Sequence, residues 1–173
     1  MKMKPKSVIK RARKSWQEKM DAPGLPKFEP VPERLVAKYG RSKMVIPSPR
    51  DVERVMKSVP EGSLITMDLL MKQIAKDYGA SVTCPMTCGI FAVITANAAD
   101  EQANTPDHPD TTPYWRTLKK GGELNPKFPG GVQQQLLMLT CEGHHIARKG
   151  DRYFVLDYKE KLVNGQGFDS GSG

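Results

Sequence analysis

The stretch from Ser48 to Ala99 is divided by start and stop signals into three predicted helices, and this division restricts the fold more than any other feature of the sequence. Each predicted helix begins at residues that favour an N-cap or a first turn, and the first two helices end at glycine-containing stops. Apolar residues recur at helical spacing between these signals. The second and third helices are joined by a short turn containing glycine, which predicts a helix-turn-helix. The starts are Ser48-Pro49, Thr66 and Thr83-Cys84-Pro85, and the stops are Pro60-Glu61-Gly62 and Gly79.

A further helix is expected over residues 132–141, directly after a pair of glycines. Its leucines are expected to face the core, and its run of three glutamines is expected to be exposed or half-exposed. The glycines are Gly130 and Gly131, the leucines are Leu136, Leu137 and Leu139, and the glutamines are Gln133, Gln134 and Gln135.

The last predicted element is a β-hairpin. Short extended runs at 145–147 and 153–156 flank a turn, residues 148–152, that carries three positive side chains. This hairpin is either a wing whose basic tip touches phosphates or a merely solvated surface turn. The sequence therefore predicts a mixed α/β, mainly helical fold that is winged-helix-like, with a helix-turn-helix and a short C-terminal β-hairpin.

Positive charge and proline are concentrated at the N-terminus. The net charge is +8, and residues 1–20 hold eight Lys or Arg against one acid, so nearly all of the excess lies there. This segment is interpreted as a basic arm that holds phosphates, with a loose, solvated terminus as the alternative. Residues 21–47 are rich in proline and predict an extended connector with one helical turn near Glu33 to Lys38, or a strap along the surface. The folded domain is expected over residues 48–160, and the end, residues 161–173, is expected to be a flexible tail.

Length and cysteine content limit the class of protein. A chain of 173 residues is long enough for one domain with a real core. No apolar run approaches the roughly 18 to 20 residues needed to span a bilayer, and the basic start lacks the apolar stretch of a signal peptide. Three cysteines do not make a disulfide framework and fit a reducing compartment. We therefore expect a soluble, cytoplasmic protein that does not contact membranes.

A zinc site is one reading of the cysteines and histidines, because they supply nitrogen and sulfur ligands. Their paired spacing is only loosely metal-like, however, and burial as a structural residue is the commoner role of cysteine. We expect neither a metal nor another cofactor. The residues are Cys84, Cys88, Cys141, His144 and His145.

An ordered series of short motifs extends from about residue 51 to residue 146. The series resembles the DNA-binding and active-site domain of the O6-alkylguanine-DNA alkyltransferases and of their non-enzymatic relatives, the alkyltransferase-like proteins. The resemblance covers a little over half of the chain and implies a DNA-binding domain, with duplex DNA and repair proteins as partners. The motifs are Val59-Pro60-Glu61-Gly62, the Thr-capped helix, the next helix with Gly89 inside it, Pro113-x-x-Arg116, Gly130-Gly131 and Glu142-Gly143-His144.

The position of the family's acceptor cysteine is changed in this sequence. The repair enzymes carry Pro-Cys-His-Arg, in which a thiolate takes the alkyl group from a flipped guanine. Here Tyr114 and Trp115 stand at the Cys and His positions, whereas Arg116 is retained and Glu142 stands where the family's glutamate would. A phenol cannot replace the thiolate and an indole cannot relay a proton, so alkyl transfer by this route is not expected. Methyltransferase activity through another nucleophile, such as Cys141 or Cys88, is the third hypothesis, and no histidine relay supports it.

The alkyltransferase-like branch also lacks the cysteine, yet it binds lesions and flags them for other repair machinery. This resemblance implies a base pocket formed by Tyr114, Trp115, Arg116 and Glu142, with Tyr114 as its aromatic floor. The alternative is that Tyr114 and Trp115 simply fill the core beside a strand.

The resemblance also implies DNA contacts outside this pocket. Met86 stands where the recognition helix of the family has an arginine that fills the gap left by the flipped base, and Met67 stands where it has a tyrosine that helps turn the phosphate. Methionine can wedge between base pairs, but it cannot donate a hydrogen bond to the orphaned base. Thr87 stands beside Met86. The residues after Arg116 themselves suggest further contacts, because Lys119, Lys120 and Lys127 flank the Gly121-Gly122 turn and the helix start at Gly130-Gly131, whose backbone amides could hold a phosphate.

Two features oppose DNA binding through the family's surface. Residues 85–99 contain no charged side chain, and residues 100–112 hold four acids and no Lys or Arg. The acidic segment is expected to be a solvated loop that points away from any ligand. The leading hypothesis is a non-catalytic DNA-binding protein that senses alkylated guanine for DNA repair. The alternative is a protein-interaction or structural module that kept the fold but lost the DNA chemistry.

Overall fold

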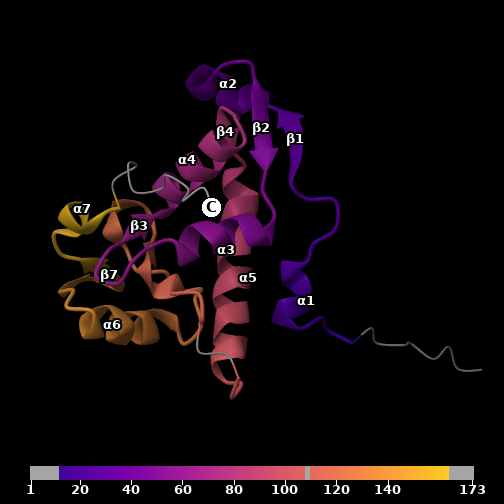
Figure 1. The fold of residues 1–173 in the computed structure, drawn as a ribbon. Helices are drawn as coiled ribbons and strands as arrows, with labels where there is room; N and C mark the ends of the chain where they lie inside the picture. Colours follow the sequence, from indigo (N-terminus) through magenta and orange to yellow (C-terminus); the bar gives the residue numbers. More distant parts are fainter. Residues whose placement is uncertain (1–11, 108–109, 164–173) are drawn as a thin grey trace, which may run out of the picture.

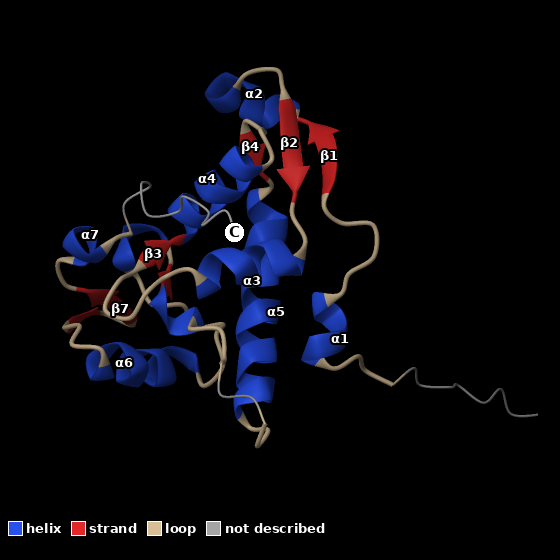
Figure 2. Ribbon diagram, in the orientation of Figure 1, coloured by secondary structure: helices blue, strands red, loops and turns tan. Residues whose placement is uncertain are grey.

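The computed structural model describes residues 12–107 and 110–163, which fold around one long helix, α5 (Figure 1). Helix α3 crosses α5, a small sheet lies at one end of it, and α6 lies to its side with a β-hairpin (Figure 2). The mixed α/β, mainly helical fold with a short C-terminal hairpin is therefore confirmed. The bounds are α3 (Pro49–Lys57), α4 (Met67–Asp77), α5 (Pro85–Ala103) and α6 (Gly131–Cys141), with a sheet of β1 (Lys27–Pro30), β2 (Lys43–Ile46) and β4 (Val82–Thr83) and a hairpin of β6 (Ile146–Lys149) and β7 (Arg152–Val155).

The first two predicted helices begin and end where the sequence signals place them. At the start of α3, Asp51 N donates to Ser48 Oγ at 3.2 Å and Ser48 N donates to Asp51 Oδ2 at 2.8 Å, which completes a capping box. Helix α4 begins directly after Thr66, although the threonine hydroxyl makes no capping bond. Gly79 follows the end of α4 with a φ of +59°, a backbone conformation that favours glycine.

Helix α5 begins at Pro85, as predicted, and is about one turn longer than predicted, since it continues to Ala103. The first residues of the predicted acidic loop, Asp100 and Glu101, therefore belong to this helix. None of the helices in residues 12–107 and 110–163 is long and apolar enough to cross a membrane.

The segment predicted as an extended connector is folded into the same body. Strand β1 pairs antiparallel with β2, and β2 pairs parallel with β4, so residues 27–46 share a sheet with the turn between α4 and α5. The predicted helical turn is α2 (Glu33–Tyr39). The prolines do not prevent this, because β1 is an edge strand with Pro30 at its end and Pro47 follows the end of β2. Val45 on β2 is fully buried in the main core, so no linker separates the chain near Pro47.

The predicted basic arm is described in part. Residues 1–11 lie outside the described residues, and the rest of the arm ends in α1 (Trp16–Met20). This short helix packs on α5 and buries the Met20 side chain. The last residues of the arm are therefore a fixed part of the fold.

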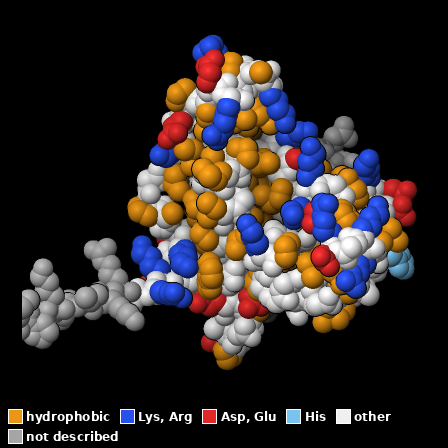
Figure 3. Space-filling model, turned by 180° about the vertical axis from the view of Figure 1, so that it is seen from behind, with side chains coloured by type: hydrophobic (Ala, Val, Ile, Leu, Met, Phe, Trp, Pro, Cys, Tyr) orange, Lys and Arg blue, Asp and Glu red, His pale blue; other side chains and the backbone are white. Residues whose placement is uncertain are grey.

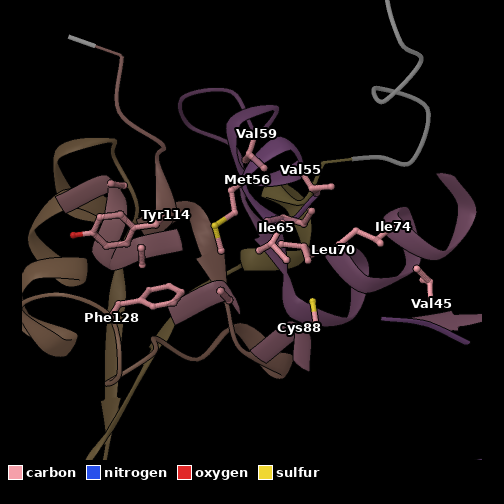
Figure 4. Close-up of a cluster of buried hydrophobic side chains, with 14 residues drawn as sticks. Val45, Val55, Met56, Val59, Ile65, Leu70, Ile74, Cys88, Tyr114 and Phe128 are labelled. Carbon is pink, nitrogen blue, oxygen red and sulfur yellow. The ribbon is translucent and has the colours of Figure 1, made fainter. Parts of the chain in front are cut away.

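The main core lies where α3 and α4 meet α5. Val55 and Met56 of α3 and Leu70 of α4 face the same interior as Cys88 of α5 (Figure 4). The α5 residues in this core are small, which allows α3 to approach α5 closely. They are Cys88, Ala92, Ala96 and Ala99.

A second core lies under α6, where β3 (Ile65–Thr66) pairs parallel with β5 (Thr117–Leu118). Two predictions for α6 are wrong: Gln135 is fully buried, and Leu137 is 55% exposed. Gln135 shares a face with Leu139 four residues later, and Leu137 lies on the opposite side. The buried amide is satisfied, because it accepts from Asn125 N at 2.7 Å and donates to two backbone carbonyls at 3.1 Å. These carbonyls belong to Trp115 and Thr117.

The predicted hairpin is present as β6 and β7, and the chain then turns back to the second core through α7 (Tyr158–Lys161). Leu64 N donates to Lys161 O at 2.8 Å and Val163 N donates to Leu64 O at 2.9 Å, so the first residues of the predicted tail are part of the fold. Residues 164–173 lie outside the described residues. Gly122, with a φ of +83°, packs so closely on the ring of Tyr158 that a Cβ atom would overlap it.

Candidate nucleic-acid interface

The Glu142 carboxylate, just after α6, accepts hydrogen bonds from two other segments of the chain, residues 115–116 and Gly62. Arg116 donates to it through Nη2 at 2.7 Å and through Nε at 3.0 Å, Trp115 Nε1 donates at 2.8 Å and Gly62 N at 3.3 Å. Arg116 Nη1 also donates to the carbonyl of Val59 at 2.8 Å. The two charged side chains are only 13% and 8% exposed. Burial opposes ionisation of Glu142, but the hydrogen bonds from Arg116 and Trp115 outweigh it and hold the carboxyl pKa below its ordinary value.

Tyr114 lies in the main core, at the start of a 3₁₀ turn (Tyr114–Arg116), and is 5% exposed. Its ring makes edge-to-face contacts with Trp115 and Phe128, each with ring centroids 5.6 Å apart. Burial raises the pKa of its phenol. The predicted pocket residues are thus brought together in the interior, with Trp115, Arg116 and Glu142 bonded to one another. This arrangement is the one expected when the aromatic residues fill the core.

His144 is also buried, at 5% exposed, and its Nε2 atom has no hydrogen-bond partner among the described residues. Burial lowers the pKa of its imidazole, and the nearby positive charges of Lys161 and Arg116 act in the same direction, whereas Glu142 opposes them. The neutral ring is therefore the form that fits this site.

Cys84 and Cys88 lie one turn apart at the start of α5, where Cys88 N donates to the carbonyl of Cys84 at 3.0 Å, whereas Cys141 lies on a different helix. Cys88 is buried in the main core, and burial raises the pKa of its thiol to about 12, so it stays protonated at neutral pH. Cys141 is exposed at the end of α6. Across the described part of the chain, no group of three or more His, Cys, Asp or Glu side chains could hold a metal ion.

One face of α5 is uncovered and lines a groove of about 770 Å³. The α5 residues along it run from Pro85 to Ile94, a length of about 14 Å, and two of them are prominent, with Met86 68% and Ile90 55% exposed. The start of α4, the end of the arm and the loop before α6 contribute the rest of the lining. These other residues are Met67, Trp16, Lys19, Lys119, Asn125, Pro126 and Lys127.

The groove is apolar along α5 and basic at its rim. Lys19, Lys119 and Lys127 line it, and none of its described lining residues is an acid. Lys119 lies 3.4 Å from Glu123 but keeps 44% of its side chain exposed. In Figure 3 an apolar band runs over the middle of the rear face, with Lys and Arg side chains around it.

A smaller hollow of about 280 Å³ adjoins the groove at Pro85. Three lysines from different segments line it, Lys38, Lys72 and Lys120, together with Asp68. The basic rim therefore continues past the start of α5.

The residues predicted to contact DNA divide into two sets. Met67, Met86 and Lys119 meet in the groove, and Lys120 lies in the adjoining hollow. The others do not line the groove. Thr87 Oγ1 lies 3.2 Å from Cys84 Sγ, Gly130 and Gly131 form the start of α6, and Gly131 N donates to the carbonyl of Phe128 at 2.9 Å.

Sequence reasoning missed several residues of the groove, chiefly Trp16, Lys19, Ile90 and Pro126. Helix α5 is apolar on all sides, so hydrophobic periodicity could not tell its buried face from its open face. Residue size could have done so, because the small side chains recur at helical spacing on one side and the large ones, including Ile90, on the other. No local signal linked Trp16 to α5, since their proximity depends on the tertiary fold.

Comparisons with known proteins found similarity at the level of structure only. No protein-family model and no curated protein matches the chain. Among solved structures, S. pombe Atl1 in complex with damaged DNA containing O6-carboxymethylguanine aligns with a TM-score of 0.45 and 19% sequence identity, covering 67% of this chain and 94% of that one. S. pombe ATL in complex with DNA aligns with the same TM-score of 0.45, identity of 19% and coverage of 67% and 94%. The groove is therefore interpreted from its own residues.

Proposed function

We propose that this protein binds duplex DNA through the groove along α5 and senses alkylated guanine without repairing it. The observation that carries the proposal is the groove itself, with an apolar floor, three lysines at its rim and no acid among its described lining residues. Lysines from separate segments of the chain that line one cleft suit the phosphate backbones of a duplex.

The apolar floor supports a specific mode of contact. Met86 and Ile90 stand one helical turn apart with most of their side chains exposed, and exposed apolar side chains of this kind wedge between base steps in many DNA complexes. The first N–H groups of α5 lie beside them and favour a nearby phosphate. An alkyl group on guanine adds apolar surface. Covering this surface with Met67, Met86 and Pro126 removes it from water and so strengthens binding.

Alkyl transfer is not part of the proposal. Tyr114 is buried and burial raises the pKa of its phenol, so it is a poor nucleophile at neutral pH. Cys88 is also buried with a thiol pKa of about 12, and Cys141 does not line the groove. The protein is therefore expected to hold a lesion and leave it unchanged.

The test is fluorescence anisotropy of the full chain with two matched duplexes, one plain and one carrying a single O6-methylguanine, across a salt titration. Tighter binding of the alkylated duplex that persists at higher salt supports the proposal, because contacts to the alkylated base do not depend on counterion release. Mass spectrometry of the protein after incubation should show no added methyl group. Equal affinity for the two duplexes would remove the sensing role, and a methylated protein would overturn the non-catalytic one.

A second candidate function is supported by the same exposed side chains. Met86 and Ile90 would also suit an apolar surface of a partner protein, since methionine adapts to irregular contacts. This function predicts that neither duplex binds, even at low salt, and that outcome would replace the DNA proposal.

A further inference from the structure

Helix α1 places an aromatic side chain at the edge of the groove. The Trp16 indole is partly exposed and lines the groove together with Lys19, whose Nζ lies 3.7 Å from the centroid of the indole ring. The same groove contains Ile94 and Val93 of α5 near this end and Asn125 and its neighbours in the loop before α6. No other aromatic residue of the described chain lines the groove.

The position of Trp16 is fixed by contacts of its neighbours with α5. Met20, one turn later, is 1% exposed against the body of the protein. Gln17 Nε2 donates to the carbonyl of Ala98 at 2.8 Å, and Gln17 N donates to the Glu101 carboxylate at 3.0 Å. These contacts hold the helix although it has only five residues, too few to be stable by itself.

The start of α1 is also capped by its own residues. Ser15 N donates to Glu18 Oε2 at 2.6 Å, and Glu18 N donates to Ser15 Oγ at 3.1 Å. This capping box and the contacts with α5 fix the helix that carries Trp16 at the edge of the groove before any ligand is present. An aromatic side chain that is already placed in this way loses little entropy on binding.

We propose that Trp16 contacts an unpaired nucleobase, which stacks on its indole while Lys19 holds the adjacent phosphate. The inference rests on the proposed function and names the chemical group that the groove recognises. Stacking on an aromatic ring needs a base whose face is free, so the preferred ligand is a duplex with one base out of the stack. Because Lys19 Nζ lies over one face of the indole, the base stacks on the opposite face, and the ammonium supplies positive charge beside the base, where the nucleotide carries its phosphate.

The experiment compares full-length wild type, Trp16→Ala and Trp16→Phe in binding to a fully paired duplex and to a duplex with one bulged guanine, at one fixed salt concentration. Wild type should prefer the bulged duplex, and Trp16→Ala should lose affinity for it roughly tenfold, as expected when one stacking contact is removed. Trp16→Phe should keep part of the preference, because phenylalanine also stacks. Phe28→Ala is the matched control, since Phe28 is an exposed aromatic outside the groove, and it should bind like wild type.

Tryptophan fluorescence separates stacking from a merely structural role of Trp16. The chain has two tryptophans, and Trp115 is partly buried, packs on the core and donates to Glu142, outside the groove. Binding of the bulged duplex should quench the fluorescence of wild type but not that of Trp16→Phe. Unchanged affinity of Trp16→Ala for the bulged duplex, or a loss of affinity without quenching in wild type, would overturn the inference. Absence of binding to any duplex by wild type would instead overturn the proposed function.

Discussion

The buried pair of Arg116 and Glu142 makes a quantitative prediction about stability. Replacing Glu142 with Gln leaves the Arg116 guanidinium charged, 13% exposed and without its carboxylate partner. Breaking a buried pair on one side typically costs about 3 to 5 kcal/mol. We expect a value of about 3 kcal/mol, because the glutamine oxygen still accepts from Trp115 Nε1 and the Val59 carbonyl still accepts from Arg116.

The assay is equilibrium unfolding in urea of four proteins: wild type, Glu142→Gln, Arg116→Met and the double variant. A loss of about 3 kcal/mol shifts the midpoint by roughly 1 to 2 M urea for a domain of this size. The loss of stability in the double variant should be smaller than the sum of the two single losses by at least about 2 kcal/mol. The reason is that removing both charges leaves neither one unpaired. Additive losses, or a loss below about 0.5 kcal/mol for Glu142→Gln, would refute the reasoning, since such values are typical of exposed pairs.

Three further predictions concern single buried positions. Gly122→Ala should destabilise the protein clearly more than Gly121→Ala in thermal unfolding, because both have a φ of +83° but only a Cβ at Gly122 meets the Tyr158 ring; equal losses would contradict this. Gln135→Leu should cost about 2 kcal/mol or more in urea unfolding, because it leaves buried backbone groups without partners; a neutral effect would be the contrary result. Between pH 7 and pH 5, the free energy of unfolding of wild type should fall more than that of His144→Gln. Burial lowers the pKa of His144 in the folded protein, so below the ordinary pKa of 6.5 the unfolded state binds the proton more readily and is favoured. Parallel pH profiles of the two proteins would contradict this.

Local signals predicted the helices well, because each depends on residues close in sequence. The capping box at Ser48 and the glycine stop at Gly79 are such signals, and α3 and α4 follow them. The N-terminal sheet was missed for the opposite reason. Strand β2 is stabilised by pairing with Val82 and Thr83, almost forty residues later, and proline frequency alone suggested an extended connector.

The candidate site was predicted in part. The resemblance to a known family selected Met67 and Met86, and the basic residues after Arg116 suggested Lys119; the structure brings all three together in the groove. The resemblance also selected Tyr114 as the floor of a base pocket, but the ring is in the core. The motif order could not reveal this, because exposure depends on how neighbouring residues such as Phe128 pack around the ring.

In the proposed complex, the lysines at the rim of the groove contact DNA phosphates. The most direct test of these contacts is the dependence of duplex affinity on salt for wild type, the double variant Lys119→Gln/Lys127→Gln and a control, Lys57→Gln. Lys57 is closely matched to Lys119. The side chain of Lys57 is 45% exposed and its Nζ lies 3.3 Å from Glu53 Oε1, whereas that of Lys119 is 44% exposed and its Nζ lies 3.4 Å from Glu123 Oε1. Lys57 does not line the groove. Each phosphate contact contributes about 0.9 to the slope of log K against log salt.

The double variant should therefore have a slope smaller than that of wild type by about 1.8, whereas the control should keep the slope of wild type. Equal slopes for all three proteins, with binding retained, would show that DNA is held elsewhere on the molecule and would contradict the proposed contacts.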